Sequence, residues 1–474
     1  MKNYCFKMKC TLLTMLIMLM SVAAFTFSQG KSNAKDRIQP WPKNLHYWQY
    51  KQKPILLLGG SDEDNLFNNP SLMEDNFKKM KLCGANYIRC TLSCRDEGNV
   101  WPFAKKDNGL YDLNEFDPKF WDRLENCLRE AQAMDVVVQI EIWATFDYYR
   151  EFWLKNPFNP TLNSNYDSSD AKLVPEWDHH PAEMRNPFFL SVPKLNNDEK
   201  VLHYQQAFVN KVLDVSLPYG NVLYCMDNET KAPAEWPHYW ADFIHKKAKQ
   251  QGYEVQLTEM WDAWDLRDEQ HSRTYKYPER FSFVDVSQNN WQVGQTHYDN
   301  LMWYRNMLVD QPGGVRPMNN VKVYQRQGGG KPNDPIISVD RWWQNVFAGC
   351  ASTRFHRPDG GIGLDERAQK TIQAAQTLFG EFDIFHSEPK PALLSDREEN
   401  EAYCLAGGTN YAVYFPTGGE VKLAVPVRDA PYRLRWFDPE KSTFLNAVFS
   451  DGDNTPIALK TPDEKQTWFV IVNQ

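Results

Sequence analysis

The chain has 474 residues, a formal net charge of −8 and an aromatic content of 14%, including 17 Trp. An acidic surface of mixed charge argues against nucleic acids and anionic membranes as partners. The length exceeds that of an ordinary single domain, although one large (β/α)₈ barrel can absorb more than about 300 residues.

The first 29 residues are typical of a secretory signal. Lys2, Lys7 and Lys9 form a basic start, and an apolar run over residues 12–20 follows that is too short to span a bilayer. Loss of these three lysines changes the net charge from −8 to −11. We therefore expect an exported protein without a membrane span, periplasmic or extracellular after cleavage of residues 1–29.

Seven cysteines follow this segment, an odd number at wide spacings. The spacings match no metal-binding pattern, so most of these thiols are expected to be buried as small apolar side chains. A disulfide between Cys90 and Cys94 remains an open alternative.

From residue 53 onward, short aliphatic runs alternate with amphipathic stretches, which predicts a parallel sheet covered by helices. The expected strands are residues 54–59, 86–91, 136–143, 222–226, 255–258, 281–286, 321–324 and 351–355. Helices are expected after Asp117-Pro118, from about 236 to Gly252, and from 364 to Gly380. Because no Gly-rich phosphate turn of the doubly wound folds is present, the prediction is a closed (β/α)₈ barrel over residues 35–387.

Two further segments complete this organisation. About 55 residues rich in Pro, Asn and aromatics separate the third strand from a helix near residues 204–217, and such long loops are usually functional. After residue 388, short alternating runs separated by turns predict a small β-sandwich over residues 388–474.

The main candidate site is the tetrapeptide Asp227-Asn228-Glu229-Thr230, directly behind the apolar run 222–226. Barrel enzymes keep catalytic groups at the carboxyl ends of their strands. The alternative is that Asn and Asp simply end the strand and open a turn. On the first interpretation Glu229 is a general acid and Asn228 orients a substrate hydroxyl.

Hydrolysis of a glycoside needs a second carboxylate, as nucleophile or as the base that activates water. Glu259 ends the next predicted strand and is the leading candidate, although a charged rim residue is an equal alternative. Glu141 and Asp285, also at strand ends, are weaker candidates for contact with the substrate.

Other residues at the same ends are candidates for binding. Arg89 is expected to tether a carboxylate or substrate hydroxyl, or to form a buried ion pair. His356 is expected to bind substrate or to mark a loop exit. Trp143, Trp261 and Trp291 are candidate platforms for stacking on sugar rings, with ordinary core packing as the alternative.

Two other chemistries are disfavoured. Glu176 and the run 178–180 (Asp-His-His) look like a metal cluster, but adjacent histidines are poorly placed to share one ion. No G-x-S-x-G elbow of a serine hydrolase occurs. No metal and no cofactor are therefore expected.

Several motifs match one known group. They are Tyr47-Trp48-Gln49-Tyr50 with the run 54–60, Asn86-Tyr87-Ile88-Arg89, the pair Asn228-Glu229, and the segments 414–419 and 435–439. Together they resemble exported bacterial glycoside hydrolases of the large barrel clan, especially the apiosidase-like group with its C-terminal β-domain labelled collagen-binding. The resemblance implies glycoside hydrolysis with the general acid/base role on Glu229.

One position departs from that group. The clan carries its nucleophilic Glu at the end of strand seven, where this chain has Tyr324-Gln325-Arg326. The second role thus stays open between Glu259, Asp285 and an inverting water. The prediction is a hydrolase of a poly- or oligosaccharide. The alternatives are a non-catalytic glycan-binding protein on a decayed barrel and, third, a polysaccharide lyase.

Overall fold

The computed structural model describes residues 34–180, 183, 185–326, 331–453 and 455–474. The predicted signal segment 1–29 lies outside the described residues. Within them, no helix has the length and apolar character needed to cross a membrane.

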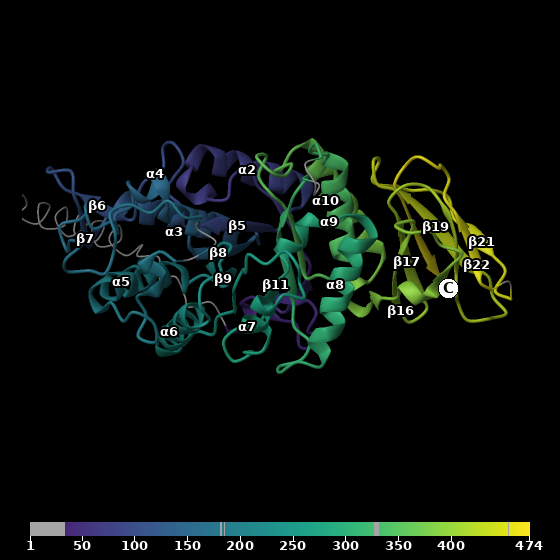
Figure 1. The fold of residues 1–474 in the computed structure, drawn as a ribbon. Helices are drawn as coiled ribbons and strands as arrows, with labels where there is room; N and C mark the ends of the chain where they lie inside the picture. Colours follow the sequence, from purple (N-terminus) through teal and green to yellow (C-terminus); the bar gives the residue numbers. More distant parts are fainter. Residues whose placement is uncertain (1–33, 181–182, 184, 327–330, 454) are drawn as a thin grey trace, which may run out of the picture.

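Eight parallel strands form the barrel, as predicted (Figure 1). They are β4 (Leu57–Gly60), β5 (Tyr87–Thr91), β8 (Val137–Trp143), β9 (Val222–Asp227), β10 (Leu257–Thr258), β11 (Val284–Asp285), β12 (Met318–Val323) and β13 (Ser352–Phe355). Their order is β10-β9-β8-β5-β4-β13-β12-β11. In this described part of the chain no ladder joins the short end strands β10 and β11, so the barrel is nearly closed.

Helices cover the outside of the barrel. They are α2 (Pro70–Cys83), α3 (Pro118–Ala133), α4 (Arg150–Trp153), α5 (Glu199–Ser216), α6 (Glu235–Gln251), α7 (Ser272–Tyr275), α8 (Gly294–Val309), α9 (Pro335–Phe347) and α10 (Glu366–Glu381). The predicted boundaries at Asp117 and Gly252 are confirmed: Asp117 caps α3 through Lys119 N at 2.9 Å, and Gly252 ends α6 with φ of 82°. The predicted end at Gly380 is wrong, because α10 continues through Gly380 and stops at the extended Phe382.

A small sheet of β1 (Gln39–Pro40), β2 (Trp48–Tyr50) and β3 (Lys53–Ile55) packs against the barrel interior. Trp48 is fully buried with the inward-facing Leu57, and its Nε1 donates to Asn319 Oδ1 at 2.9 Å. The first predicted strand, residues 54–59, is therefore two strands. Its start pairs in this antiparallel sheet, and only the part from Leu57 onward enters the barrel.

The long connection between β8 and α5 folds over the same end of the barrel as the carboxyl ends of the strands. It contains η3 (Thr145–Tyr148), α4 and η5 (Pro187–Leu190), and the rings of Tyr148 and Phe188 stack at 4.3 Å to anchor it. A hairpin of β6 (Phe103–Lys105) and β7 (Tyr111–Phe116) was not predicted and lies between β5 and α3.

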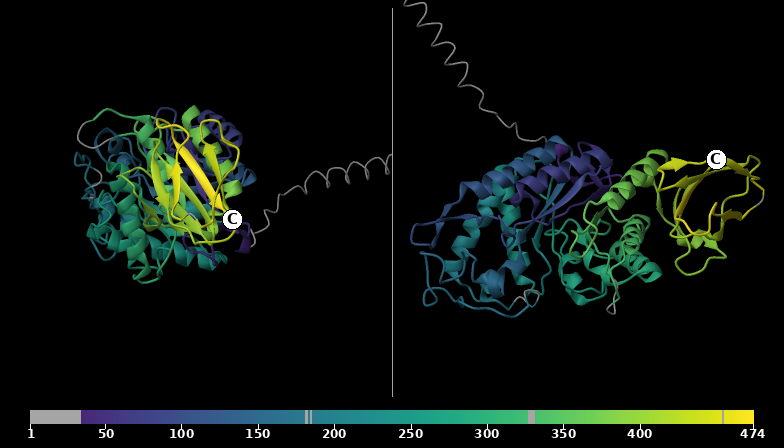
Figure 2. Two further views of the ribbon diagram at one scale, coloured as in Figure 1. Left: turned by 90° about the vertical axis from the view of Figure 1, so that its right-hand side faces the viewer. Right: turned by 90° about the horizontal axis from the view of Figure 1, so that it is seen from above.

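Residues from 388 onward form two antiparallel sheets around their own apolar core (Figure 2). The larger contains β14 (Glu388–Pro389), β16 (Tyr403–Gly407), β17 (Asn410–Phe415), β19 (Tyr432–Asp438), β20 (Thr443–Phe444), β21 (Val448–Ser450) and β23 (Trp468–Asn473). The smaller contains β15 (Leu394–Ser395), β18 (Glu420–Leu423) and β22 (Ile457–Lys460). Side chains from both sheets fill the space between them, which is the arrangement of a sandwich.

The sandwich packs on the side of the barrel formed by α8, α9 and α10 (Figure 1). The rings of Trp343 and Phe469 lie 4.4 Å apart across this contact, and Tyr414 Oη donates to Asp340 Oδ1 at 3.1 Å. Burial raises the pKa of Asp340 to about 7. The centre of this contact is therefore apolar, and an ion pair between Arg435 and Glu381 at 2.8 Å also crosses it.

The seven cysteines of the described residues are all free and buried. Cys90 Sγ lies 4.0 Å from Cys127 Sγ, across the contact of β5 with α3. The alternative of a disulfide between Cys90 and Cys94 is therefore not realised.

Candidate active site

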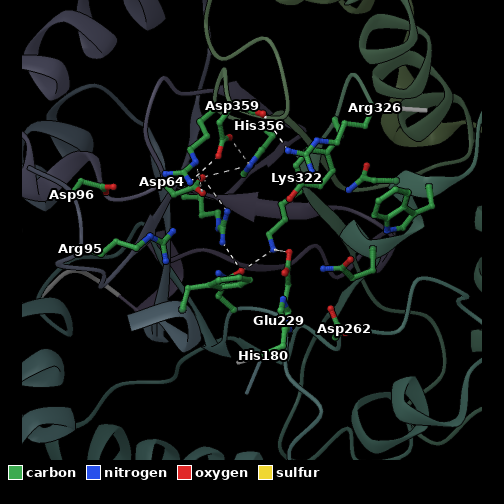
Figure 3. Close-up of a pocket in the computed structure, with 18 of the residues that line it drawn as sticks. Asp64, Arg95, Asp96, His180, Glu229, Asp262, Lys322, Arg326, His356 and Asp359 are labelled. Atoms are coloured by element: carbon green, nitrogen blue, oxygen red, sulfur yellow. Dashed lines mark hydrogen bonds and ion pairs between the residues drawn. The ribbon is translucent and has the colours of Figure 1, made fainter. Parts of the chain in front are cut away.

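A pocket of about 650 Å³ opens at the carboxyl ends of the barrel strands (Figure 3). This is the end at which barrel enzymes carry their catalytic groups, and the volume suits a small-molecule site. The lining side chains are Asp64, Arg89, Arg95, Asp96, Phe146, Phe152, His180, Asn228, Glu229, Asp262, Gln288, Asn290, Trp291, Lys322, Tyr324, Arg326, His356, Arg357 and Asp359.

Glu229 lies two residues past the end of β9, and its backbone is left-handed with φ of 61°. Such a conformation is costly for a residue with a side chain and is found preferentially at functional sites. It points the carboxylate at Lys322 of β12, whose Nζ donates to Glu229 Oε1 and, at 2.7 Å, to Asn228 Oδ1 (Figure 3).

This contact decides the charge of Glu229. Burial alone raises the pKa of its carboxyl, but attraction to Lys322 and the hydrogen bond from its ammonium outweigh burial and lower the pKa to about 2. Glu229 is therefore ionised at neutral pH. It fits the role of a base or nucleophile better than that of a resting proton donor.

Arg89 of β5 holds the neighbouring groups in place. Its guanidinium contacts Asn228 Oδ1 at 2.7 Å, Glu141 Oε1 at 2.6 Å and Asp64 Oδ1 at 3.0 Å. Arg89 therefore forms the buried ion pairs of the second alternative, and it also orients Asn228. Glu141 lies outside the pocket lining and acts on it only through Arg89 and Thr91.

A second group of charges surrounds Asp64. Its carboxylate lies 3.0 Å from Arg89, 3.4 Å from Arg354 and 3.7 Å from both His356 and Arg357. Burial opposes ionisation, but these cations hold the pKa of Asp64 well below its usual value. His356 lines the pocket as expected and also contacts Asp359 at 3.4 Å.

The structure does not bring Glu259 into the pocket lining. Its side chain is buried beneath, where Oε1 accepts from the backbone N–H groups of Met260 at 2.7 Å and Asp227 at 3.1 Å. No cation compensates this carboxyl, so burial and then the neighbouring Asp227 raise the pKa of Glu259 well above its usual value. Burial likewise raises the pKa of Asp227 to about 7.

Asp285, at the end of β11, is also absent from the pocket lining. It accepts from the backbone N–H and from the hydroxyl of Ser287, both at 2.9 Å, and burial raises its pKa to about 7. Asp285 therefore fixes the segment that follows β11, η7 (Ser287–Trp291).

Only one of the three candidate tryptophans faces the pocket. Trp143 is core and packs 5.2 Å from the ring of Trp240, while Trp261 is buried and donates to Thr274 Oγ1 at 2.7 Å. Trp291, in contrast, is 49% exposed and lines the pocket.

Asp262 is the carboxylate that the sequence interpretation missed. The loops after β9 and β10 pair through Thr230 N with Met260 O (3.0 Å) and Asp262 N with Thr230 O (2.9 Å), which places Asp262 beside Glu229 (Figure 3). Burial raises the pKa of Asp262, and the charge of Glu229 contributes, although Lys231 lies 3.1 Å away. The pocket thus holds two adjacent carboxyls with pKa values moved in opposite directions.

The structure also locates the polar loop residues considered for a metal. His180 lines the pocket, whereas His179 packs against Trp177 outside it. In the described ranges, no three His, Cys, Asp or Glu side chains gather in an arrangement that could hold a metal ion.

Comparison with solved structures identifies similar architecture over almost the whole chain. A glycoside hydrolase family 5 protein from Bacteroides vulgatus superposes with a TM-score of 0.62 at 13% identity, covering 92% of this chain and 94% of that one. Another glycoside hydrolase superposes with a TM-score of 0.61 at 13% identity, covering 93% of this chain and 97% of that one. The fold is that of glycoside hydrolase barrels. No protein-family model and no curated protein sequence matches the chain.

Proposed function

We propose that this protein hydrolyses a glycosidic bond in a poly- or oligosaccharide, with Glu229 as its central acid/base residue. The observation that carries the proposal is the pair Asn228-Glu229 at the end of β9, facing a pocket at the carboxyl end of a barrel. The neighbouring architectures and the resemblance to the apiosidase-like group support the same class. The predicted signal segment supports export.

The assignment of roles follows from charge. Hydrolysis requires one protonated and one ionised carboxyl group on either side of the scissile bond. Glu229, paired with Lys322, supplies the ionised group. Asp262, whose pKa burial raises although Lys231 lies 3.1 Å away, takes the role of proton donor in this proposal in place of Glu259, which lies outside the pocket lining.

The reaction balances with these residues. Asp262 donates its proton to the leaving glycosidic oxygen as the bond to the anomeric carbon breaks. Glu229 accepts a proton from the water whose oxygen bonds to that carbon. Exchange with solvent then returns both carboxyls to their starting states. Asn228 holds a hydroxyl of the sugar, because Arg89 and Lys322 both donate to its Oδ1 and leave its amide hydrogens for the substrate.

One observation favours a second candidate, a glycan-binding protein without turnover. Lys322 stands near the end of strand seven, where the resembling clan carries a nucleophilic Glu, and it engages Glu229 directly. A substrate that does not displace this contact would bind without reacting.

The test compares the wild type with Glu229→Gln, Asp262→Asn and the control Glu259→Gln on polysaccharides and aryl glycosides, with released sugar as the readout. We expect Glu229→Gln to lose about a thousandfold in rate on every substrate. Asp262→Asn should lose about a hundredfold on polysaccharides but little on aryl glycosides with acidic leaving groups, which need no proton. Glu259→Gln should stay active.

Two results would overturn these assignments. Full activity of Glu229→Gln would remove Glu229 from the reaction. Glycan binding by the wild type without release of sugar from any substrate would establish the second candidate.

A further inference from the structure

The segment η7, directly after β11, presents three uncharged side chains to the pocket: Gln288, Asn290 and Trp291. Asn290 and Trp291 have no place in the reaction proposed above, and Gln288 enters it only by helping to lower the pKa of Glu229. Their surroundings indicate what they bind.

Two amide atoms of this segment are buried without a partner. Gln288 Nε2 and Asn290 Oδ1 make no hydrogen bond of good geometry with any described residue, although the two residues are only 6% and 4% exposed. The Gln288 amide is nevertheless close enough to Glu229 to help lower the pKa of that carboxyl. Asn290 Nδ2 donates to Ser287 O, which leaves Oδ1 as its unmet acceptor. Buried polar groups are normally satisfied, so an unmet donor and an unmet acceptor on one pocket wall point to a ligand that supplies both.

Trp291 adds a flat apolar surface to the same wall. Its side chain is 49% exposed at the pocket, whereas most tryptophans of the barrel are buried. A half-exposed indole beside polar groups is suited to one face of a ring that carries both C–H and O–H groups.

The segment is rigid because its other side chains are tied down. Asp285 accepts twice from Ser287, whose hydroxyl also accepts from Val321 N at 2.8 Å. Asn289 donates to His297 O of α8 at 3.0 Å. A wall held in this way loses little conformational entropy when a ligand binds.

We propose that Gln288, Asn290 and Trp291 form a subsite for a neutral sugar ring next to Glu229. One ring hydroxyl accepts from Gln288 Nε2, another donates to Asn290 Oδ1, and a ring face stacks on Trp291. A uronate is disfavoured at this position, because its carboxylate would meet the Asn290 oxygen and the nearby charge of Glu229, although Lys322 and Arg326 also line the pocket. This inference rests on the proposed glycan function and specifies the substrate class at one position.

The experiment is saturation-transfer NMR on the full chain with two probe sets: glucose, galactose, mannose, xylose and arabinose, and the uronic acids of glucose and galactose. We expect at least one neutral sugar to bind. Trp291→Ala should weaken that binding about tenfold and Asn290→Ala about three- to tenfold. Trp291→Phe, which keeps a flat ring, should retain most of it.

Trp264→Ala is the matched control, because Trp264 is 53% exposed but lies outside the pocket lining. Unchanged melting temperatures establish that the variants fold. If Asn290→Ala does not fold, sugar binding by Trp291→Ala tests the subsite instead, because Trp291 is half-exposed.

Three outcomes would contradict the proposed subsite. Neutral-sugar binding that is unaffected by Trp291→Ala and Trp291→Phe overturns the subsite but leaves the glycan function standing. Binding of uronic acids alone overturns the neutral class. Absence of binding for every sugar overturns the subsite, and release of sugar from polysaccharides by the wild type then decides separately whether the glycan function stands.

Discussion

The pocket and the layer of the barrel directly beneath it both contain buried carboxyl side chains, but the pKa values are shifted in opposite directions in the two layers. In the pocket, Asp64 and Glu229 lie against arginine and lysine side chains, and their pKa values are lowered. Beneath it, Asp227 and Glu259 lie against each other, the Trp236 indole N–H donates to Asp227, and backbone N–H groups donate to Glu259. Neither carboxyl forms an ion pair within the described part of the chain, and both pKa values are raised. Asp227 and Glu229 are only two positions apart in the chain.

This contrast shows that the compensating cation, and not position at a strand end, decides which carboxyl is ionised. Burial penalises the charged form in both layers. Lys322 and Arg89 overcome that penalty in the pocket, whereas in the lower layer protonation removes the charge instead. The predictions below test each side of the comparison.

Removal of the cation should have the largest effect. In Lys322→Met, Glu229 is left buried without its partner, and we expect the free energy of unfolding to fall by about 3–5 kcal/mol at pH 7. Chemical denaturation measures this change. The double variant Lys322→Met/Glu229→Gln should recover a large part of the loss, because no uncompensated charge remains. A single variant as stable as the wild type would refute the role given to Lys322.

The lower layer should control stability in the range from about pH 4 to pH 7. The folded-state pKa of Asp227 is raised to about 7 from an ordinary 3.8, so the folded protein retains a proton that the unfolded chain has lost. Stability from this group is complete below about pH 4 and is lost as the pH rises through about 7, by about 1.4 kcal/mol per unit.

Asp227→Asn should therefore reduce the slope of the unfolding free energy against pH over this window. The reduction should correspond to the release of up to one proton on unfolding. Glu229→Gln is the opposite control, because the pKa of Glu229 is lowered: its contribution is present above about 4.5 and is lost as the pH falls toward 2. Equal slopes for Asp227→Asn and the wild type between pH 4 and 7 would show that Asp227 is not protonated in the fold.

The smallest effect is expected for Glu259→Gln. A protonated Glu and a Gln have nearly the same shape, so the cost at pH 7 should stay below about 1 kcal/mol. Asp64→Asn provides the contrast, because it removes the charge that compensates Arg89 and Arg354 and should cost about 3–5 kcal/mol. Equal losses in the two variants would contradict the distinction between the layers.

Much of the fold follows from patterns in the sequence. The barrel strands appear as apolar runs separated by helical stretches of suitable length, because parallel strands are buried on both faces. The start of the first strand was misplaced because Pro54 and Ile55 run directly into the apolar residues 56–58 but pair in a different sheet. The hairpin of β6 and β7 was missed because its strands are short and only partly buried.

The candidate site could be predicted best where a residue follows a strand, as Asn228, Glu229 and His356 do. Arg89 was found although it lies within β5, and Trp291 was found as an aromatic side chain suited to a sugar ring. Lys322 within β12 was missed, although a lysine in the run 318–323 is itself a signal of an inward-facing charge.

Two other assignments depended on contacts that no sequence pattern reports. Asp262 reaches the pocket through the pairing of two loops, and Glu259 turns away from it toward backbone N–H groups. Asp262 and Glu259 are only three positions apart in the chain, and the pocket contains the one that was not expected. Strand ends cannot be placed from sequence precisely enough to distinguish the two.

The most direct test of the account is a pH titration of the side-chain carboxyls by NMR, with ¹³C-labelled glutamate and the variants Glu229→Gln and Glu259→Gln for assignment. We expect the Glu229 signal to be ionised from neutral pH down to about 3, and the Glu259 midpoint to lie well above its ordinary value. In Lys322→Met the Glu229 midpoint should rise above its ordinary 4.5. A Glu229 midpoint at or above 4.5 in the wild type, or a Glu259 midpoint at its ordinary value, would contradict the account.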